Sequence, residues 1–290
     1  MPVQVTLDPW MLRSAPIEQV FDAAAEAGYA WLELTPREDF LPLYRGPRCD
    51  AGRVARVRDL ARDSGVGIAS LFVVYRWANP DEVERRRAVR YWAAAIDVAG
   101  QLGVSRLNTE LSSVSDAEFP DGAREASWWA SIEEILPMLE SAGMTLAVEP
   151  HPGDFIENAK QAIDLIRGTG SDRLAYLHCI PHTFWLGAGI DEIVAYAGPL
   201  LTHVHVADTF APARIIGNVR HRQASEPRPH MHIDIGRGEI DWEQTAAVLR
   251  RAGFDGILTV CVFGYEERAA ESFRANRGAV ARLFEGVAST

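Results

Sequence analysis

Three short segments in the second half of the chain each join strand-forming apolar residues to side chains that can bind a metal or transfer a proton. They are Met144–His151, Leu174–Gly187 and Leu201–Asp208, and together they contain glutamate, cysteine, histidine and aspartate. All 8 histidines of the chain lie between His151 and His232. Imidazole, thiolate and carboxylate are the usual protein ligands of Zn²⁺. This clustering predicts that the chemistry is concentrated in this part of the chain.

The segments that must position these residues follow one repeating pattern. A short apolar run, predicted to be a strand, leads through a loop into a segment with apolar residues at helical spacing. The predicted strands are Val3–Asp8, Ala30–Thr35, Val66–Val74, Val104–Leu111, Met144–Glu149, Leu174–Cys179, Leu201–Ala207 and Gly256–Val262. The predicted helices are Pro16–Ala27, Gly52–Asp63, Asp81–Leu102, Ser127–Ser141, Asn158–Arg167, Ile190–Ala197, Trp242–Ala252 and Glu267–Glu285.

This alternation favours one α/β fold over the others. Several predicted helices end at a glycine such as Gly103, which suits the left-handed conformation that closes many helices. The repeated unit predicts a single (β/α)₈ TIM barrel, with residues 1–290 as one domain. A doubly wound sheet is the alternative, but no Gly-x-Gly-x-x-Gly motif follows the first strand.

The longest irregular stretch is a predicted insertion between strands seven and eight, at Phe210–Ile235. It is rich in arginine and histidine, including Arg214 and His232, although the whole chain is acidic. Loops of this length are usually functional or disordered, and loops after barrel strands form the catalytic face. We therefore expect a lid or an anion-binding segment; a solvated surface loop is the alternative.

The charge balance bears on the expected partners. The chain has 29 Lys and Arg against 40 Asp and Glu, a formal net charge of −11 that repels nucleic acid and anionic membrane surfaces. No apolar run approaches about 18 residues and no secretion signal is recognisable, so we expect a cytoplasmic protein. The three cysteines, Cys49, Cys179 and Cys261, are too few for a disulfide framework and indicate buried, ligating or reactive thiols.

In a TIM barrel the carboxyl ends of all strands meet at one mouth. Taken singly, each side chain expected there has an ordinary structural explanation, such as an ion pair for a glutamate or an apolar environment for a cysteine. Together they predict a divalent-metal site with one position open for water or substrate. The residues concerned are Glu149, His151, Cys179, His182, His205, Asp208 and Cys261.

Several motifs then carry a resemblance to a known family. They are Glu149–Pro–His, a strand ending in Cys–Ile–Pro–His182 and followed by Phe–Trp–Leu–Gly, His203–Val–His–Val–Ala–Asp, His232–Ile–Asp–Ile–Gly–Arg–Gly–Glu–Ile–Asp–Trp and Phe254–Asp–Gly–Ile–Leu–Thr–Val. Over nearly its whole length the chain resembles the sugar phosphate isomerase/epimerase family of xylose-isomerase-like TIM barrels. In that family a Glu, an Asp, a His and a Glu at the ends of strands five to eight hold a metal. The resemblance implies that Glu149 is the first ligand and His205 the third.

The other two family ligands are replaced. Cys179 stands where the family has Asp in an Asp-x-x-His pattern, and Cys261 stands at the position of the last Glu. One interpretation is a softer site of Glu149, Cys179, His205 and Cys261 that favours Zn²⁺ or Fe²⁺, with Mn²⁺ possible. A second is a metal-free site that transfers protons directly. A third is a barrel that has lost catalysis. A register slip of one residue would bring His178 inward in place of Cys179.

The resemblance implies an isomerase or epimerase that acts on a sugar, keto-sugar or cyclitol by removing a proton next to a carbonyl. Glu149 would take the proton, Cys261 or His151 would return one, and a metal, or His182 with Arg214, would stabilise the oxyanion. Further substrate contacts are expected from His232, Trp77, Trp185 and Asp208.

Other functions remain open on the same residues. A lyase, either a dehydratase or a keto-glycoside β-eliminating enzyme, would begin with the same proton abstraction. A non-catalytic sugar-binding protein or partner subunit is the alternative outside catalysis, and a homo-oligomer is compatible with the sequence. An endonuclease would need metal ligands on the early strands, and strands two and three end in Thr35–Pro36 and Val73–Val74.

Overall fold

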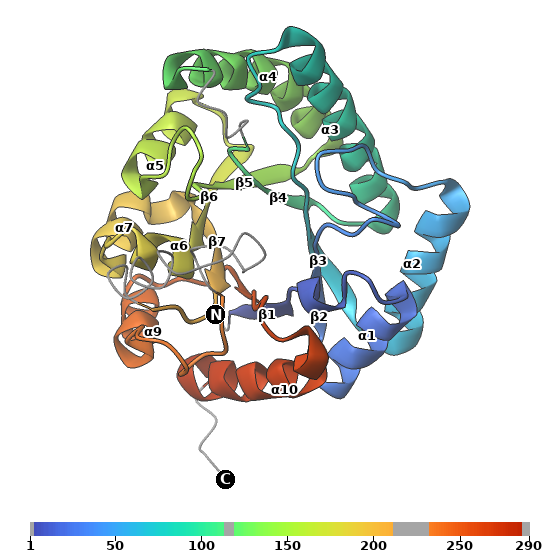
Figure 1. Ribbon diagram of the computed structural model, residues 1–290, viewed down its shortest axis with the longest axis vertical. Helices are drawn as coiled ribbons and strands as arrows, with labels where there is room; N and C mark the ends of the chain where they lie inside the picture. The colour runs from blue at the N-terminus through green and yellow to red at the C-terminus, as the bar shows by residue number, and fades with distance from the viewer. Residues whose placement is uncertain (1–2, 113–118, 211–231, 286–290) are drawn as a thin grey trace, which may run out of the picture.

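The computed structural model describes residues 3–112, 119–210 and 232–285, and in them eight parallel strands close into a barrel in sequence order (Figure 1). The strands are β1 (Gln4–Leu7), β2 (Trp31–Leu34), β3 (Gly67–Phe72), β4 (Arg106–Glu110), β5 (Thr145–Glu149), β6 (Leu174–Cys179), β7 (Leu201–Val206) and β8 (Ile257–Val260). The predicted TIM barrel is confirmed. Most of the predicted insertion after β7, residues 211–231 with Arg214, lies outside the described residues.

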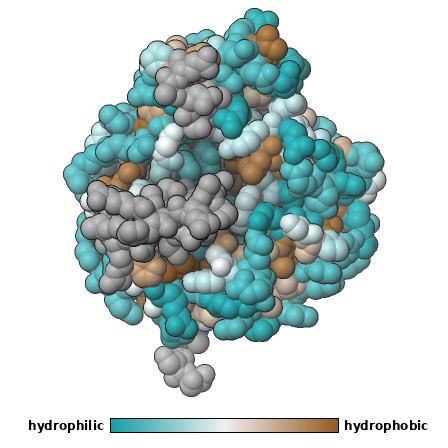
Figure 2. Space-filling model, viewed as in Figure 1, coloured by the Kyte–Doolittle hydropathy of each residue, from teal (hydrophilic) through white to brown (hydrophobic). Residues whose placement is uncertain are grey.

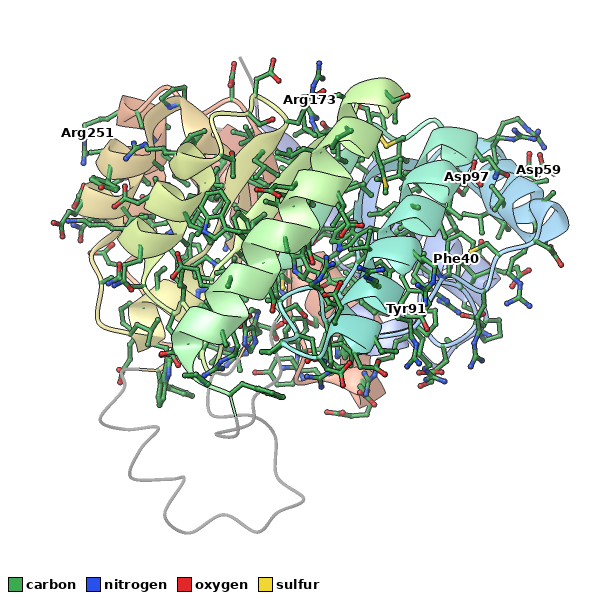
Figure 3. All side chains as sticks on the ribbon, turned by 90° about the horizontal axis from the view of Figure 1, so that it is seen from above. Phe40, Asp59, Tyr91, Asp97, Arg173 and Arg251 are labelled. Carbon is green, nitrogen blue, oxygen red and sulfur yellow. The ribbon has the colours of Figure 1, made fainter. Side chains whose placement is uncertain are left out.

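Helices surround the barrel on the outside (Figure 1). They are α1 (Ile17–Glu26), α2 (Ala51–Ser64), α3 (Glu82–Leu102), α4 (Asp121–Ala142), α5 (Ala159–Gly168), α6 (Ile180–Trp185), α7 (Ile190–Ala197), α9 (Trp242–Arg251) and α10 (Ala269–Val280). Figure 3 shows α3 and α4 side by side, with charged side chains such as Asp97 and Arg251 directed away from the barrel. The face seen in Figure 2 is mostly hydrophilic. None of the described helices is both long and apolar enough to cross a membrane.

Two helices differ from the sequence prediction. Helix α4 begins at Asp121 rather than at Ser127, because its first turns are polar and carry no apolar period. Helix α6 was not predicted, since six residues are too few to show a helical repeat. It begins directly after β6, with Cys179 as its N-cap, and this short turn carries His182. As expected, Gly103 ends α3 in the left-handed region, with φ 73°.

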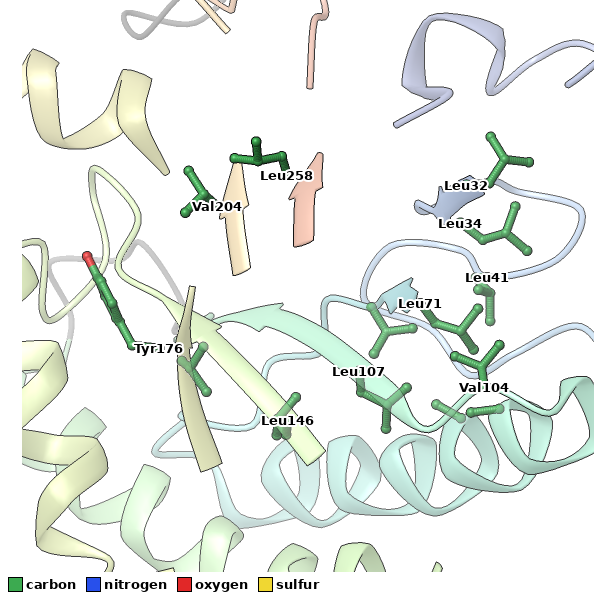
Figure 4. Packing of buried hydrophobic residues seen from close by; sticks show 14 of the residues in the cluster. Leu32, Leu34, Leu41, Leu71, Val104, Leu107, Leu146, Tyr176, Val204 and Leu258 are labelled. Atoms are coloured by element: carbon green, nitrogen blue, oxygen red, sulfur yellow. The ribbon is translucent and has the colours of Figure 1, made fainter. Parts of the chain in front are cut away.

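The strands divide their side chains between two environments. One set packs outward against the helices and forms the main hydrophobic core, as Leu32, Leu107 and Leu146 do in Figure 4. The other set fills the barrel. Near the mouth the barrel interior contains a small apolar cluster with Phe72, Leu177 and Cys179. Parallel strands are thus buried on both faces, as is usual for this fold.

Two register irregularities set which side chains meet inside the barrel. One lies between Leu32 and Glu33 where β2 pairs with β3, and it pairs Glu33 with Ser70. The other lies between β6 and β7 and pairs Cys179 with His205. Such bulges re-aim side chains near functional sites. Cys179 therefore faces inward, and the alternative with His178 inward is wrong. His178 lies on the other face of β6, where its Nδ1 is 3.1 Å from the hydroxyl oxygen of Tyr176.

Candidate functional site

A cavity of about 350 Å³ lies at the carboxyl ends of the strands. Six of the residues predicted from the sequence line it, namely Glu149, His151, His182, His205, His232 and Cys261. They come from β5, β7 and the segments that follow β5, β6, β7 and β8. The structure therefore brings these six together. Aromatic side chains of Trp10, Phe72 and Phe263 complete much of the wall.

His205 lies between two carboxylates at the floor of this cavity. Its Nε2 is 2.8 Å from Glu33 Oε1, and its Nδ1 is 3.2 Å from Glu149 Oε2. All three side chains are buried. Burial lowers the pKa of His205, but Cys261, Glu33 and Glu149 outweigh burial and hold that pKa well above its usual value. Without a bound cation, His205 is therefore an imidazolium.

Glu33 is the carboxylate that fixes the position of His205. Burial raises its pKa, but the charge of His205 and the hydrogen bonds to its oxygens outweigh burial, and the pKa falls to about 2. Ser70 Oγ donates to its Oε2 over 2.7 Å, and Asn108 Nδ2 also donates to Oε2. The Glu33 carboxylate is charged and held on several sides, so it can orient a neighbouring imidazole.

Beneath the cavity, His203 joins this polar network. Its Nδ1 lies 3.0 Å from Asn108 Nδ2, and its Nε2 lies 2.7 Å from Thr259 Oγ1. Burial lowers the pKa of His203 to about 3, so the ring is neutral. From the sequence, His203 was expected only to pack in the core. In the structure it is a hydrogen-bonded part of the network around Glu33.

Two thiols lie beside the imidazole of His205. Ligand atoms of Glu149, Cys179 and His205 all lie within 4.8 Å of one another. Cys261 Sγ lies 3.3 Å from His232 Nδ1, and the imidazole of His205 acts on its pKa. Burial raises the pKa of Cys179 to about 12 and raises that of Cys261 well above its usual value. Both are neutral thiols without a cation, and a divalent ion would deprotonate a thiol that it coordinates.

These residues fit a divalent cation. Nε2 of His205 donates to Glu33, and Nδ1 faces Glu149. In many metal sites a carboxylate holds one ring nitrogen of a histidine in this way while the other nitrogen binds the metal. Among the described residues, Glu149 Oε2 is a buried oxygen that accepts no hydrogen bond of good geometry. A carboxylate, an imidazole and a thiol together are a donor set for a borderline or soft ion. The metal role of Glu149, Cys179, His205 and Cys261 stays a prediction, and Cys261 lies outside the compact three-residue group.

The fold and this geometry agree with the comparisons. The family model described as a xylose isomerase-like TIM barrel matches residues 21–280. The chain belongs to this family. The comparison with proteins of curated function found no match.

Several solved structures align with almost the whole chain. The IolI protein with a bound zinc atom has 14% identity and a TM-score of 0.78, covering 99% of this chain and 100% of that one. An L-ribulose 3-epimerase has 17% identity and a TM-score of 0.76, covering 98% and 95%. The 3-keto-D-glucoside 4-epimerase YcjR of E. coli has 12% identity and a TM-score of 0.75, covering 97% and 99%. At these identities the likeness shows the shared fold.

Three imidazoles at the mouth of the barrel, those of His151, His182 and His232, lie in a row. The ring centroids of His151 and His182 are 4.6 Å apart, and those of His182 and His232 are 5.1 Å apart. His151 Nε2 also lies 3.9 Å from Glu110 Oε1. These residues are close enough to act on one ligand in the cavity.

Three other predicted substrate contacts, all among the described residues, do not line the cavity. Trp77 is fully buried and packs against Trp92, with ring centroids 5.3 Å apart. Trp185 ends α6 and is absent from the cavity wall. Asp208 is buried and accepts bonds from Trp242 Nε1 and from backbone N–H groups, which anchors the chain where it returns toward β8. Arg214 lies outside the described residues.

Sequence reasoning missed three acidic residues at this mouth. Glu33, Asp8 and Glu110 lie on or just after β2, β1 and β4, whereas the predicted ligands all come from the ends of strands five to eight. The available signal was a charge inside or at the end of an apolar strand, such as Glu33 between Leu32 and Leu34. A charge buried in a strand is costly unless it is paired, so it predicts a partner inside the barrel.

Replacing Glu33 with glutamine tests its role in positioning His205. We expect Glu33→Gln to weaken Zn²⁺ binding by roughly 10–100-fold, the usual effect of losing a carboxylate that orients a ligand histidine. The measurement is a competition titration against a chelator. Glu38→Gln, an exposed carboxylate, is the matched control. Equal affinities of Glu33→Gln and the unaltered protein would contradict the role given to Glu33.

Asp8 predicts a pH dependence of folding stability. Burial raises its pKa from 3.8 to about 7, although Thr35 Oγ1 donates to it over 2.7 Å. The raised pKa means that the native state binds this proton more tightly than the unfolded state does. The contribution of Asp8 to the free energy of unfolding is therefore full below about pH 4 and is lost as pH rises toward 7. Over about three pKa units the loss is of order 4 kcal/mol at most.

Asp8→Asn removes this ionisation and keeps an oxygen that can accept from Thr35. We therefore expect the variant to be about 2–4 kcal/mol more stable than the unaltered protein at pH 8, and similar to it at pH 4. Urea unfolding with a chelator present measures the difference at each pH. Parallel stability curves for the two proteins would show that Asp8 does not titrate in this way.

Proposed function

We propose that the cavity is the active site of a sugar isomerase or epimerase that removes a proton from the carbon next to a carbonyl. The observation that carries this proposal is Glu149, a buried carboxylate beside the imidazole of His205 in the wall of the cavity. Membership of the xylose isomerase-like family supports it. So do the similar structures, two of which are named as sugar epimerases.

Glu149 has the properties of the proton acceptor. Burial raises the pKa of its carboxyl group above the usual value, and His205 opposes that shift. A carboxylate with a raised pKa is a stronger base than an exposed one, which suits abstraction of a weakly acidic carbon-bound proton. The same group returns the proton when the reaction runs in the other direction.

Cys261 is the proposed proton donor on another wall. It follows β8, which is separated from β5 by β6 and β7, so the two groups approach a ligand from different sides. Because burial keeps the pKa of the Cys261 thiol high, this thiol is protonated at neutral pH. His151, at the rim, is the second candidate for this step. Two groups on different walls are what inversion of a carbon centre requires.

The negative charge that develops on the substrate oxygen needs donors. His182 and His232 line the cavity and offer ring N–H groups to such an oxygen. When bound by Glu149, Cys179 and His205, which leaves the Cys261 thiol protonated, a divalent ion such as Zn²⁺ or Fe²⁺ would supply Lewis-acid polarisation of the carbonyl. Arg214 is a further proposed contact.

The cavity suits a small sugar. Its volume of about 350 Å³ lies toward the lower end of small-molecule pockets, which span on the order of 300–1,000 Å³. The rings of Trp10 and Phe263 lie on its wall with centroids 5.9 Å apart. Aromatic faces can pack on the apolar face of a sugar ring while the polar groups bind its hydroxyls. A monosaccharide, a keto-sugar or a cyclitol is the proposed substrate.

Exchange of a carbon-bound proton with solvent tests the proposal directly. In D₂O the metal-supplemented protein should introduce deuterium next to the carbonyl of at least one member of a ketose, keto-glycoside and inosose panel, as followed by NMR. We expect Glu149→Gln to lower this rate by about 10²–10⁴-fold, the range for loss of a general base.

The matched control for this experiment is Glu133→Gln, on the exposed face of α4, which should keep the unaltered rate. No deuterium incorporation across the panel would contradict the proposed reaction. An unsaturated product in place of an epimer would overturn the isomerase assignment and favour a lyase with the same first step.

A further inference from the structure

A second cavity, of about 640 Å³, adjoins the proposed active site. The two cavities share four wall residues, Trp10, Arg13, Pro36 and Leu43, so they lie side by side at the mouth of the barrel. The wall of this adjoining cavity comes from the segments that follow β1 and β2. It is larger than the proposed active site, so it has room for a group at least as large as the small sugar proposed to bind there.

Arg37 holds together the two segments that form the adjoining cavity. Its buried guanidinium donates from Nη2 to the backbone oxygen of Ala15 over 2.6 Å, and from Nε to Asp39 Oδ1 over 2.5 Å. The first of these hydrogen bonds joins the segment after β2 to the segment after β1. Walls that are fixed before a ligand arrives reduce the entropy that is lost on binding. The adjoining cavity is therefore preorganised for a ligand.

The charges in this wall favour an uncharged ligand. Both arginines that line the adjoining cavity among the described residues already contact a carboxylate, Arg13 that of Glu266 and Arg37 that of Asp39. A phosphate group would have to compete with these carboxylates for the guanidinium groups, and it would be repelled by their negative charge. The side chain of Asp39 is half exposed, and its oxygens have lone pairs left to accept from hydroxyl groups.

Apolar surface lies next to these polar groups. Trp10, Pro36 and Leu43 are the apolar residues that the two cavities share. The guanidinium of Arg13 lies over the ring of Trp10, 4.9 Å from its centroid, which fixes a polar group beside an aromatic one. Pockets for small molecules combine apolar walls with a few fixed polar groups in this way. A second hydroxylated ring fits this description.

We propose that the adjoining cavity is a subsite for an uncharged second unit of the substrate. The inference rests on the proposed function: the small sugar in the active site would be one end of a glycoside, and the unit joined to it would lie past the shared wall, near Asp39. A glycosidic bond joins its two units through one oxygen, which suits two cavities that share a wall. A free monosaccharide would leave the adjoining cavity without a ligand, and a sugar phosphate would meet its carboxylates.

Calorimetric titration with matched ligands tests the subsite. The reference ligand is the methyl glycoside of a glucose that carries a ketone at its third carbon. It is compared with disaccharides that carry a second glucose, in different linkages, in place of the methyl group, and with the same methyl glycoside phosphorylated at its sixth carbon. With the full-length, zinc-supplemented protein, we expect at least one disaccharide to bind about 10-fold more tightly than the reference, the gain from one hydrogen bond to a charged group. The phosphorylated ligand should show no such gain.

Two variants locate the gain in the adjoining cavity. Ser14 is exposed and lines only this cavity, so Ser14→Trp should fill it and remove the advantage of the disaccharide over the reference. Ser141→Trp, at an exposed position of α4, is the matched control and should keep that advantage. Asp39→Asn keeps the shape of the wall but removes a charge, and it should reduce the advantage several-fold. It decides the question if Ser14→Trp fails to fold.

Three results would overturn the subsite: no disaccharide that binds more tightly than the reference, tighter binding of the phosphorylated ligand than of every disaccharide, or an unchanged advantage in the folded variants. The titrations measure binding alone, so they separate the subsite from the reaction. If only the reaction is wrong, a disaccharide binds tightly without deuterium exchange. If only the subsite is wrong, the reference ligand exchanges deuterium and the second glucose adds no affinity.

Discussion

The ion pair between Glu33 and His205 is the interaction on which the site depends. A charge inside a barrel is stable only when it is paired and hydrogen-bonded. Here Glu33 accepts a hydrogen bond from His205 Nε2 over 2.8 Å and further hydrogen bonds from Ser70 and Asn108. The imidazole is then left with one direction for Nδ1, toward Glu149. The position of the proposed base and that of the proposed metal both follow from this single buried contact.

The two cysteines change the charge of this centre when no cation is bound. A carboxylate at either position would add a negative charge beside Glu33 and Glu149 in a buried site, which costs free energy unless it is neutralised. A buried thiol instead stays protonated, as the raised pKa values of Cys179 and Cys261 indicate. The site can therefore lose its cation with little electrostatic repulsion among its side chains, and it can bind an ion that displaces the thiol protons. Thiols also favour softer ions than the carboxylates that they replace.

The barrel was predictable because its signal is local and repeated: each strand is a short apolar run, and helices such as α3 end at a glycine. The convergence of Glu149, Cys179 and His205 followed from the rule that strand ends meet at one mouth. Glu33 was missed because an alternating Leu–Glu–Leu pattern usually means a half-exposed strand, and only the closed barrel shows that its polar face is inside. The pairing of Cys179 with His205 depends on a register irregularity between β6 and β7 that no local pattern encodes. Trp77 was predicted to contact the substrate, but its side chain is buried against Trp92 of α3 and Trp128 of α4.

Cys179 is the thiol in the compact group with Glu149 and His205, so it offers the most direct test of a thiol-containing metal centre. The measurement is elemental analysis of the protein purified without added metal or chelator, beside Cys179→Ala purified in the same way. The account predicts zinc or iron at about one ion per chain or more in the unaltered protein, and its loss in the variant. A metal-free unaltered protein, or equal metal content in the two, would contradict it.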